Sequence, residues 1–152
     1  MRKAARQLPA EEAEKVLKAC SWGTLGLIGD DDFPYTVPLN YVYTDGCIFF
    51  HCASEGYKLE CIKRNPKVSF TAVEKAEVDT ESYSTFYRSV TVIGTAEILE
   101  DSTQRYGAVK KLCEALGAAT DAPCIEKTLK GEMPSMTVVK IIPAEITGKQ
   151  RI

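Results

Sequence analysis

The sequence is short of the residues that the common metal sites of proteins require. Of its 152 residues only His51 is a histidine, and its six cysteines include no Cys-x-x-Cys pair. A zinc cluster of cysteine and histidine ligands would have neither a second imidazole nor a paired set of thiolates. We therefore expect no metal centre.

Three further absences concern the location and partners of the protein. No apolar run approaches the roughly 18 residues that a membrane-spanning helix needs. Residues 1–16 include basic side chains but no apolar core of a secretory signal. The formal net charge of -2 gives no positive field that would attract nucleic acid. We expect a cytoplasmic protein that binds neither a membrane nor nucleic acid.

The composition is that of one globular domain covering residues 1–152. Hydrophobic residues make up 45% of the chain, which is enough to build a core at this length. Most of the cysteines stand among apolar neighbours, where a free thiol packs as a small hydrophobic group. The exception is Cys52, which follows the single histidine. The six are Cys20, Cys47, Cys52, Cys61, Cys113 and Cys124.

Hydrophobic periodicity predicts a mainly β protein with peripheral helices. Pro34 and Pro38 place the second predicted strand at an edge or a bulge, and Asp45-Gly46 indicates a hairpin after it. Asp101-Ser102 is a predicted N-cap. Hairpin connections favour an antiparallel barrel over a doubly wound sheet. The strands are expected at residues 22–28, 33–43, 47–52, 68–73, 82–99 and 136–146, and the helices at residues 9–20, 56–64, 102–116 and 122–130.

The segment 47–66 is the most informative part of the chain. An apolar strand, residues 48–50, runs into His51 and a turn of small residues, and Ser54 is the expected N-cap of the next helix. Lys58 falls in the first turn of that helix, where the helix dipole and free N–H groups favour an anion instead of a cation. This placement is explained if a phosphate binds there, although Lys58 as an ordinary surface lysine remains the alternative.

The order of short motifs resembles a known family. From residue 34 to residue 74 the chain contains V-P-L-N-Y, a D-G hairpin, F-H-C-A, G-x-K and R-N-P, and residues 87–99 add a long strand. This order resembles the flavin-binding split barrels of the pyridoxamine 5'-phosphate oxidase-like superfamily, and within it the nitroimidazole-resistance (Nim-type) branch. The resemblance implies a six-stranded antiparallel split β-barrel, and a homodimer that binds FMN in two clefts at the subunit interface.

The same resemblance implies roles for individual residues. Lys58 would neutralise the 5'-phosphate of FMN, and Arg88 is a candidate contributor from the opposing subunit. Arg88 could equally pair with a carboxylate on the surface. The residues expected to border the flavin ring and ribityl chain are Val37, Pro38, Leu39, Asn40, His51, Cys52, Ala53 and Ser54.

Two departures from the family pattern narrow the expected activity. Close relatives often have G-H-K where this chain has Gly56-Tyr57-Lys58, and the C-terminal residues 143–152 lack the histidine of true pyridoxamine 5'-phosphate oxidases. Oxidation of vitamin B6 is therefore not expected. The tyrosines Tyr41, Tyr43 and Tyr57 are expected to pack in the barrel and not to stack on flavin.

Two classes of function follow from the sequence. The first is a flavin-dependent oxidoreductase acting on a small molecule such as a nitroaromatic compound, a quinone-like compound or another flavin, with His51 as the candidate catalytic residue. The second is a non-catalytic module that binds or sequesters a flavin or another ligand, in which His51 only packs. The residues alone leave both open.

Overall fold

The protein is described by a computed structural model that covers residues 4–117 and 123–152. Its strands are β1 (Trp22–Ile28), β2 (Pro34–Asn40), β3 (Val42–Thr44), β4 (Cys47–Ala53), β5 (Lys67–Asp79), β6 (Ser84–Ile98) and β7 (Met136–Arg151). Its helices are α1 (Ala10–Ala19), α2 (Tyr57–Arg64), α3 (Ser102–Ala115) and α4 (Pro123–Glu132), with short 3₁₀ turns at Ala4–Arg6, Asp30–Asp32 and Met133–Ser135.

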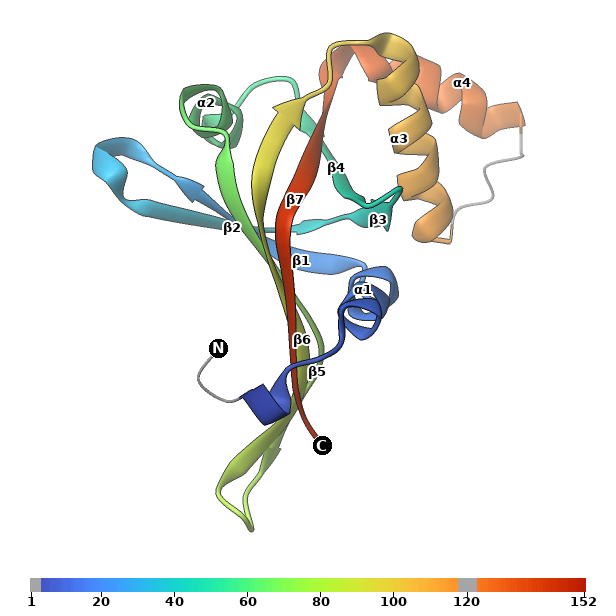
Figure 1. The fold of residues 1–152 in the computed structure, drawn as a ribbon. Helices are drawn as coiled ribbons and strands as arrows, with labels where there is room; N and C mark the ends of the chain where they lie inside the picture. The colour runs from blue at the N-terminus through green and yellow to red at the C-terminus, as the bar shows by residue number, and fades with distance from the viewer. Residues whose placement is uncertain (1–3, 118–122) are drawn as a thin grey trace.

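All seven strands belong to one antiparallel sheet with the order β2-β1-β5-β6-β7-β4-β3. Its two edge strands, β2 and β3, are neighbours along the chain, separated only by Tyr41. The sheet therefore curls until its edges meet through one residue of chain and not through a ladder of hydrogen bonds (Figure 1). This arrangement is a split barrel with peripheral helices, which confirms the predicted fold class.

The sheet has seven strands and not six because the predicted strand 33–43 is interrupted. The backbone N–H of Tyr41 bonds to the Ser21 carbonyl, and its hydroxyl donates to the Leu17 carbonyl at 2.8 Å. Tyr41 is thereby turned into the core, where it is 1% exposed, and the strand on either side divides into β2 and β3. Pro34 and Pro38 lie in an edge strand as expected, where a missing N–H donor leaves no gap in the sheet.

The core lies inside the curled sheet and is closed by α1. Val16 and Leu17 of α1 are fully buried and contribute to a cluster with Ile48 and Phe50 of β4. Tyr43 is also buried, so the expected packing role of Tyr41 and Tyr43 is confirmed. A smaller cluster lies under α3, where Val109 packs with Val138 and Leu99.

The turns that the sequence predicts are present. Asp45 and Gly46 both have positive φ angles, 52° and 72°, as a tight two-residue hairpin requires. Asp101 caps α3 by accepting a 2.8 Å hydrogen bond from the Gln104 backbone N–H. The predicted helix 122–130 corresponds to α4, although residue 122 lies outside the described residues. Five cysteines are free thiols, and the side chain of Cys124 lies outside the described part.

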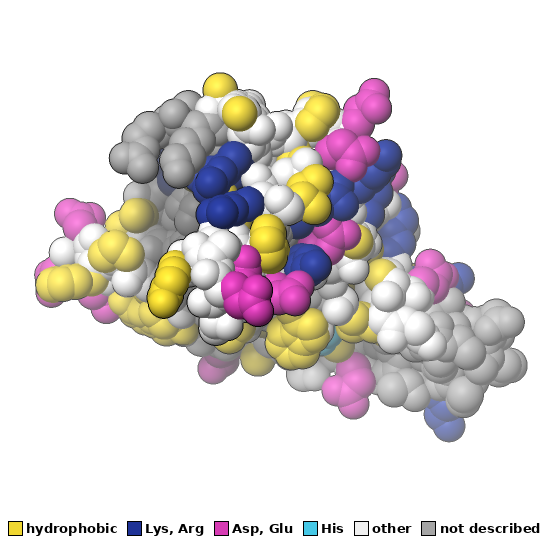
Figure 2. Space-filling view, turned by 90° about the horizontal axis from the view of Figure 1, so that it is seen from below, with side chains coloured by type: hydrophobic (Ala, Val, Ile, Leu, Met, Phe, Trp, Pro, Cys, Tyr) yellow, Lys and Arg dark blue, Asp and Glu magenta, His cyan; other side chains and the backbone are white. Residues whose placement is uncertain are grey.

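Strand β5 extends well beyond the predicted residues 68–73, whereas β6 lies within the predicted residues 82–99. Their pairing continues past a bulge between Val73 and Lys75 to Asp79, and the hairpin projects from the body of the protein (Figure 1). Seen from the side of this hairpin, acidic and basic side chains are interspersed (Figure 2). No helix of the described chain has the length and apolar character that crossing a bilayer demands.

Candidate flavin site

Helix α2 begins without a capping side chain. Its N-cap is Gly56, with φ 139° and ψ 158°, a conformation that essentially only glycine adopts. The prediction that Ser54 is the N-cap is wrong, because the N-cap is Gly56, two residues later. The backbone N–H of Ser54 bonds to the Ser135 carbonyl and prolongs the pairing of β4 with β7. Within the described chain, the N–H groups of Tyr57 and Lys58 donate no hydrogen bond. Two free donors at the start of an eight-residue helix are groups that an anion satisfies.

Lys58 is a half-buried cation that forms no ion pair with any described residue. It lies close enough to His51 and Cys52 to influence the pKa of both. Partial burial lowers the pKa of His51, and the like charge of Lys58 lowers it further. Burial raises the pKa of the Cys52 thiol, and Lys58 opposes that effect. The structure therefore brings together His51, Cys52 and Lys58, with His51 neutral at pH 7.

The alternation of side chains along β4 explains why His51 is available at the surface. Ile48 and Phe50 point into the main core, so Phe49 and His51 belong to the opposite face of the strand. Phe49 is covered by the cluster under α3, whereas His51, paired with Val138, is exposed. A neutral imidazole in this position can donate one hydrogen bond and accept another.

The start of α2 lies between β2 and β4, the two strands whose residues the family resemblance implies as flavin contacts. The ring of Tyr57 meets that of Tyr35 in β2 edge to face, with 5.0 Å between centroids, while Lys58 is close to His51 in β4. Val37 and Leu39 of β2 are only partly buried against the core. Asn40 donates from its side chain to the Ser21 carbonyl at 3.3 Å. Pro38, Ala53 and Ser54 are exposed. The roles of these residues as flavin contacts stay predictions.

Arg88 lies far from this group within one chain. His51 pairs with Val138 near the start of β7, and Arg88 pairs with Gln150 near its end. Twelve residues of strand between those positions correspond to roughly 40 Å of path at about 3.3 Å per residue. One flavin cannot contact both ends of β7 in the same chain, so Arg88 could reach a flavin at His51 only from a second copy.

In the single chain Arg88 is occupied by two carboxylates. Its guanidinium contacts Glu12 of α1 and Glu74 of β5, at 2.5 and 3.0 Å. These pairs agree with the alternative reading of Arg88 as the partner of surface carboxylates. They also tie α1 to the bulge in β5.

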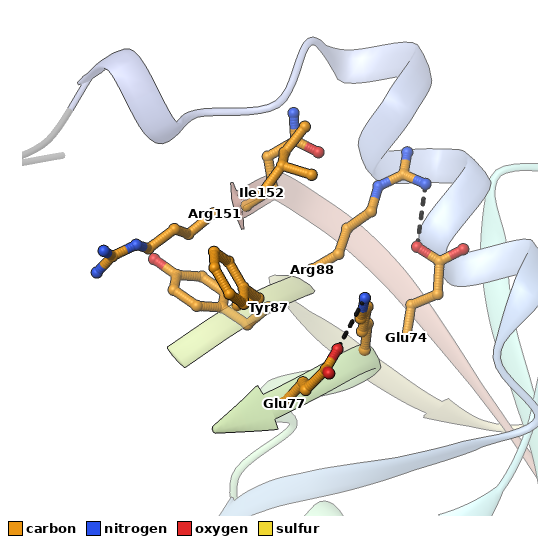
Figure 3. Close-up of a pocket in the computed structure, with 9 residues that line it drawn as sticks. Glu74, Glu77, Tyr87, Arg88, Arg151 and Ile152 are labelled. Atoms are coloured by element: carbon orange, nitrogen blue, oxygen red, sulfur yellow. Dashed lines mark ion pairs between the residues drawn. The ribbon is translucent and has the colours of Figure 1, made fainter. Parts of the chain in front are cut away.

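A groove of about 710 Å³ lies beside Arg88 at this end of the sheet. Figure 3 shows Tyr87, Arg151 and Ile152 around it, with the Arg88–Glu74 ion pair along one side. Lys75, which also lines the groove, pairs with Glu77 at 3.0 Å. Two of its three basic side chains, Lys75 and Arg88, are already paired with carboxylates. The third, Arg151, lies at the end of β7, without the free helix N–H groups that α2 presents beside Lys58. The α2 region is accordingly the stronger candidate for binding a phosphate.

One element of the site was missed by sequence reasoning. The hydroxyl of Tyr57 accepts a 2.7 Å hydrogen bond from the backbone N–H of Asp30, which lies 27 residues earlier. The G-x-K motif gave no signal for this contact, since only the folded chain brings the turn at Asp30 beside α2. The expectation that Tyr57 packs in the barrel is wrong, because its side chain is 37% exposed and its hydroxyl contacts the Asp30 turn.

Comparisons with known proteins agree with this architecture. A conserved hypothetical protein of Mycobacterium tuberculosis has a similar structure, with a TM-score of 0.83, 23% identity, and coverage of 97% of this chain and 88% of that one. A candidate 5-nitroimidazole antibiotic resistance protein of Bacteroides thetaiotaomicron has a TM-score of 0.79 and 20% identity, covering 94% and 85%. An FAD-binding protein of Mesorhizobium loti has a TM-score of 0.71 and 27% identity, covering 97% and 98%.

Sequence comparisons place the chain in a family. No curated protein matches it significantly. The family model described as pyridoxamine 5'-phosphate oxidase matches residues 9–150, which is nearly the whole chain. Together with the split barrel, this match shows that the chain belongs to the pyridoxamine 5'-phosphate oxidase family.

Proposed function

We propose that the protein is a homodimeric FMN-binding oxidoreductase that reduces a small aromatic or nitroaromatic acceptor. The observation that carries the proposal is Lys58, a half-buried cation that makes no ion pair with a described residue and lies beside two N–H groups without a described acceptor at the start of α2. A terminal phosphate satisfies this cation and both donors together. Membership of the family and the similarity to an FAD-binding protein support a flavin as the molecule that carries the phosphate.

FMN is proposed in preference to FAD because of the charge at this site. FMN ends in a phosphate monoester that one lysine and two backbone donors can bind.

A homodimer is proposed because the site is open in the single chain. His51 is exposed, so a flavin ring lying against it would have one side in water unless a second copy covered it. Because roughly 40 Å of strand separate the positions of β7 that pair with His51 and Arg88, Arg88 can contribute only across such an interface. Static light scattering at micromolar concentration should give twice the 16.7 kDa mass of the chain. A monomeric mass for FMN-loaded protein would contradict the dimer.

When bound, FMN would supply the hydride and electron chemistry, and the residues of the chain would bind and orient it. Lys58 and the start of α2 would hold the phosphate, and Gly56 allows close approach because it has no side chain. Neutral His51 would hydrogen-bond the substrate or the flavin edge and could hold a proton at one ring nitrogen. Cys52, with its raised pKa, would stay a neutral thiol.

The proposal is tested in two steps. Purified protein should quench FMN fluorescence on titration, with tighter binding than for riboflavin or FAD, and a protein that quenches no flavin would contradict it. The loaded protein should then oxidise NAD(P)H faster when a nitroaromatic acceptor is added. Tight FMN binding without turnover with any acceptor would favour the second candidate, a flavin-sequestering module, which the exposure of the site leaves possible.

A further inference from the structure

Tyr57 makes a contact that neither the phosphate nor the flavin requires. It is the first residue of α2, and its hydroxyl accepts the backbone N–H of Asp30 at 2.7 Å. Its ring packs edge to face on Tyr35 at 5.0 Å, with 72° between the ring planes. The side chain is thus held at both its ring and its hydroxyl by the turn and strand that follow β1.

The Asp30 turn is closed by backbone hydrogen bonds. Gly29 and Phe33 close it with a 2.8 Å hydrogen bond between the Gly29 N–H and the Phe33 carbonyl. Asp31 and Asp32 both have positive φ angles, 53° and 61°. A Cβ on Gly29 would lie 2.8 Å from the Phe33 carbonyl oxygen and 3.0 Å from the Tyr57 hydroxyl. The turn therefore leaves just enough room for this hydroxyl, provided residue 29 is glycine.

The first turn of α2 needs such an attachment. An eight-residue helix is marginal on its own, and Gly56 provides neither a capping side chain nor conformational restriction. Leu59 anchors the turn in the core, but an apolar contact does not fix the direction in which the preceding backbone N–H groups point. At the other end, Arg64 pairs with the carboxylate of Asp30 at 2.8 Å, so the same aspartate holds both ends of the helix.

We propose that Tyr57 is a positioning residue that holds Lys58 and the first N–H groups of α2 in the geometry that receives the phosphate. The inference rests on the proposed function, since it concerns the same phosphate site. Tyr57 itself does not contact the ligand. Its hydrogen bond fixes the backbone one residue before Lys58, so that the cation and donors are ordered before the ligand arrives.

The test compares phosphate-dependent with phosphate-independent binding. Tyr57→Phe keeps the ring and removes only the hydroxyl, and should weaken FMN binding roughly 3- to 10-fold while leaving riboflavin binding unchanged. Tyr35→Phe is the matched control, because the Tyr35 hydroxyl makes no hydrogen bond to a described residue and its loss should leave FMN binding unchanged. In the double variant Tyr57→Phe/Lys58→Met, the loss of FMN affinity should be smaller than the product of the two single losses, because one of the groups that Tyr57 positions is already absent.

A ligand-free measurement accompanies the titrations. The Asp30 amide should exchange its hydrogen slowly in the wild type and faster in Tyr57→Phe, because its acceptor is lost. Equal weakening of FMN and riboflavin, or additive effects in the double variant, would overturn the positioning role while leaving the phosphate site intact. So would unchanged FMN affinity in Tyr57→Phe. Wild-type protein that binds no FMN, or a Lys58→Met variant that binds it normally, would instead overturn the proposed function and this inference with it.

Discussion

Replacing Lys58 by methionine isolates the charge on which the proposed site depends. Methionine keeps an unbranched side chain of similar length, so packing near His51 changes little while the ammonium is lost. Lys58 has no ion pair in the described chain, so its removal leaves no carboxylate unpaired. We therefore expect the fold and its melting temperature to be preserved.

The size of the effect follows from a single charge-assisted contact to phosphate. Such a contact contributes about 1.5–3 kcal/mol, which corresponds to roughly 10- to 150-fold in affinity. Fluorescence titration should show this loss for FMN and none for riboflavin, which has no phosphate. The wild-type preference for FMN should also weaken as salt is raised, because part of the site is exposed.

The matched control is Lys63→Met. Lys63 lies on the same helix, is exposed, and makes no ion pair with a described residue, but it is in the last turn of α2 and not in the first. It should leave FMN affinity unchanged. If both variants weaken FMN equally, the effect is one of general charge and the reasoning about the helix start is refuted. Unchanged binding in Lys58→Met would place the phosphate elsewhere.

Because His51 is the only histidine of the chain, the remaining predictions concern one imidazole whose signal and titration cannot be confused with another. In an NMR titration the one imidazole signal should report a pKa below the ordinary 6.5 because of burial and Lys58, and Lys58→Met should raise that pKa; an unchanged value would show that Lys58 is not close to His51. Because the pKa of His51 is lower in the folded chain than in the unfolded chain, the unfolded chain binds more protons just below pH 6.5. The free energy of unfolding should therefore fall as the pH falls through this window, and it should fall less in His51→Ala. Urea unfolding at pH 5 and pH 7.5 measures this difference. If His51 takes part in proton transfer, His51→Ala should keep FMN and lose about 10²–10⁴-fold in turnover; full activity per bound flavin across pH 5–8 would leave His51 with a packing role.

The sequence predicts those parts of the fold that are governed by short-range patterns. The Asp45-Gly46 hairpin and the Asp101 cap each depend on residues a few positions apart, and both are found as expected. Strand β5 is longer than predicted because Glu74, Lys75 and Glu77 are polar on a strand whose outer half covers no core. Polar residues there pair as well as apolar ones, but they leave no hydrophobic alternation to detect.

Long-range contacts could not be predicted in the same way. Tyr41 continues the aromatic and β-branched pattern of the predicted strand 33–43, and only its hydrogen bonds to residues 17 and 21 reveal the break. For the site, the motif correctly predicted Lys58 at the start of a helix. Because Ser54 was the expected cap, the sequence did not predict that the first N–H groups of this helix have no capping side chain. The contact between Tyr57 and Asp30 depends on how the barrel curls, which no local pattern encodes.

The length of β7 has a consequence for how defects in this protein would combine. In the proposed dimer, each flavin would contact the His51–Lys58 end of one copy and the Arg88 end of the other. A subunit with Lys58→Met and a subunit with Arg88→Met would each form homodimers in which both sites are damaged. Their mixed dimer would place both substitutions in one site and leave the other site wholly wild type. Two defective preparations, once their subunits are exchanged, would therefore recover tight binding of one FMN per mixed dimer.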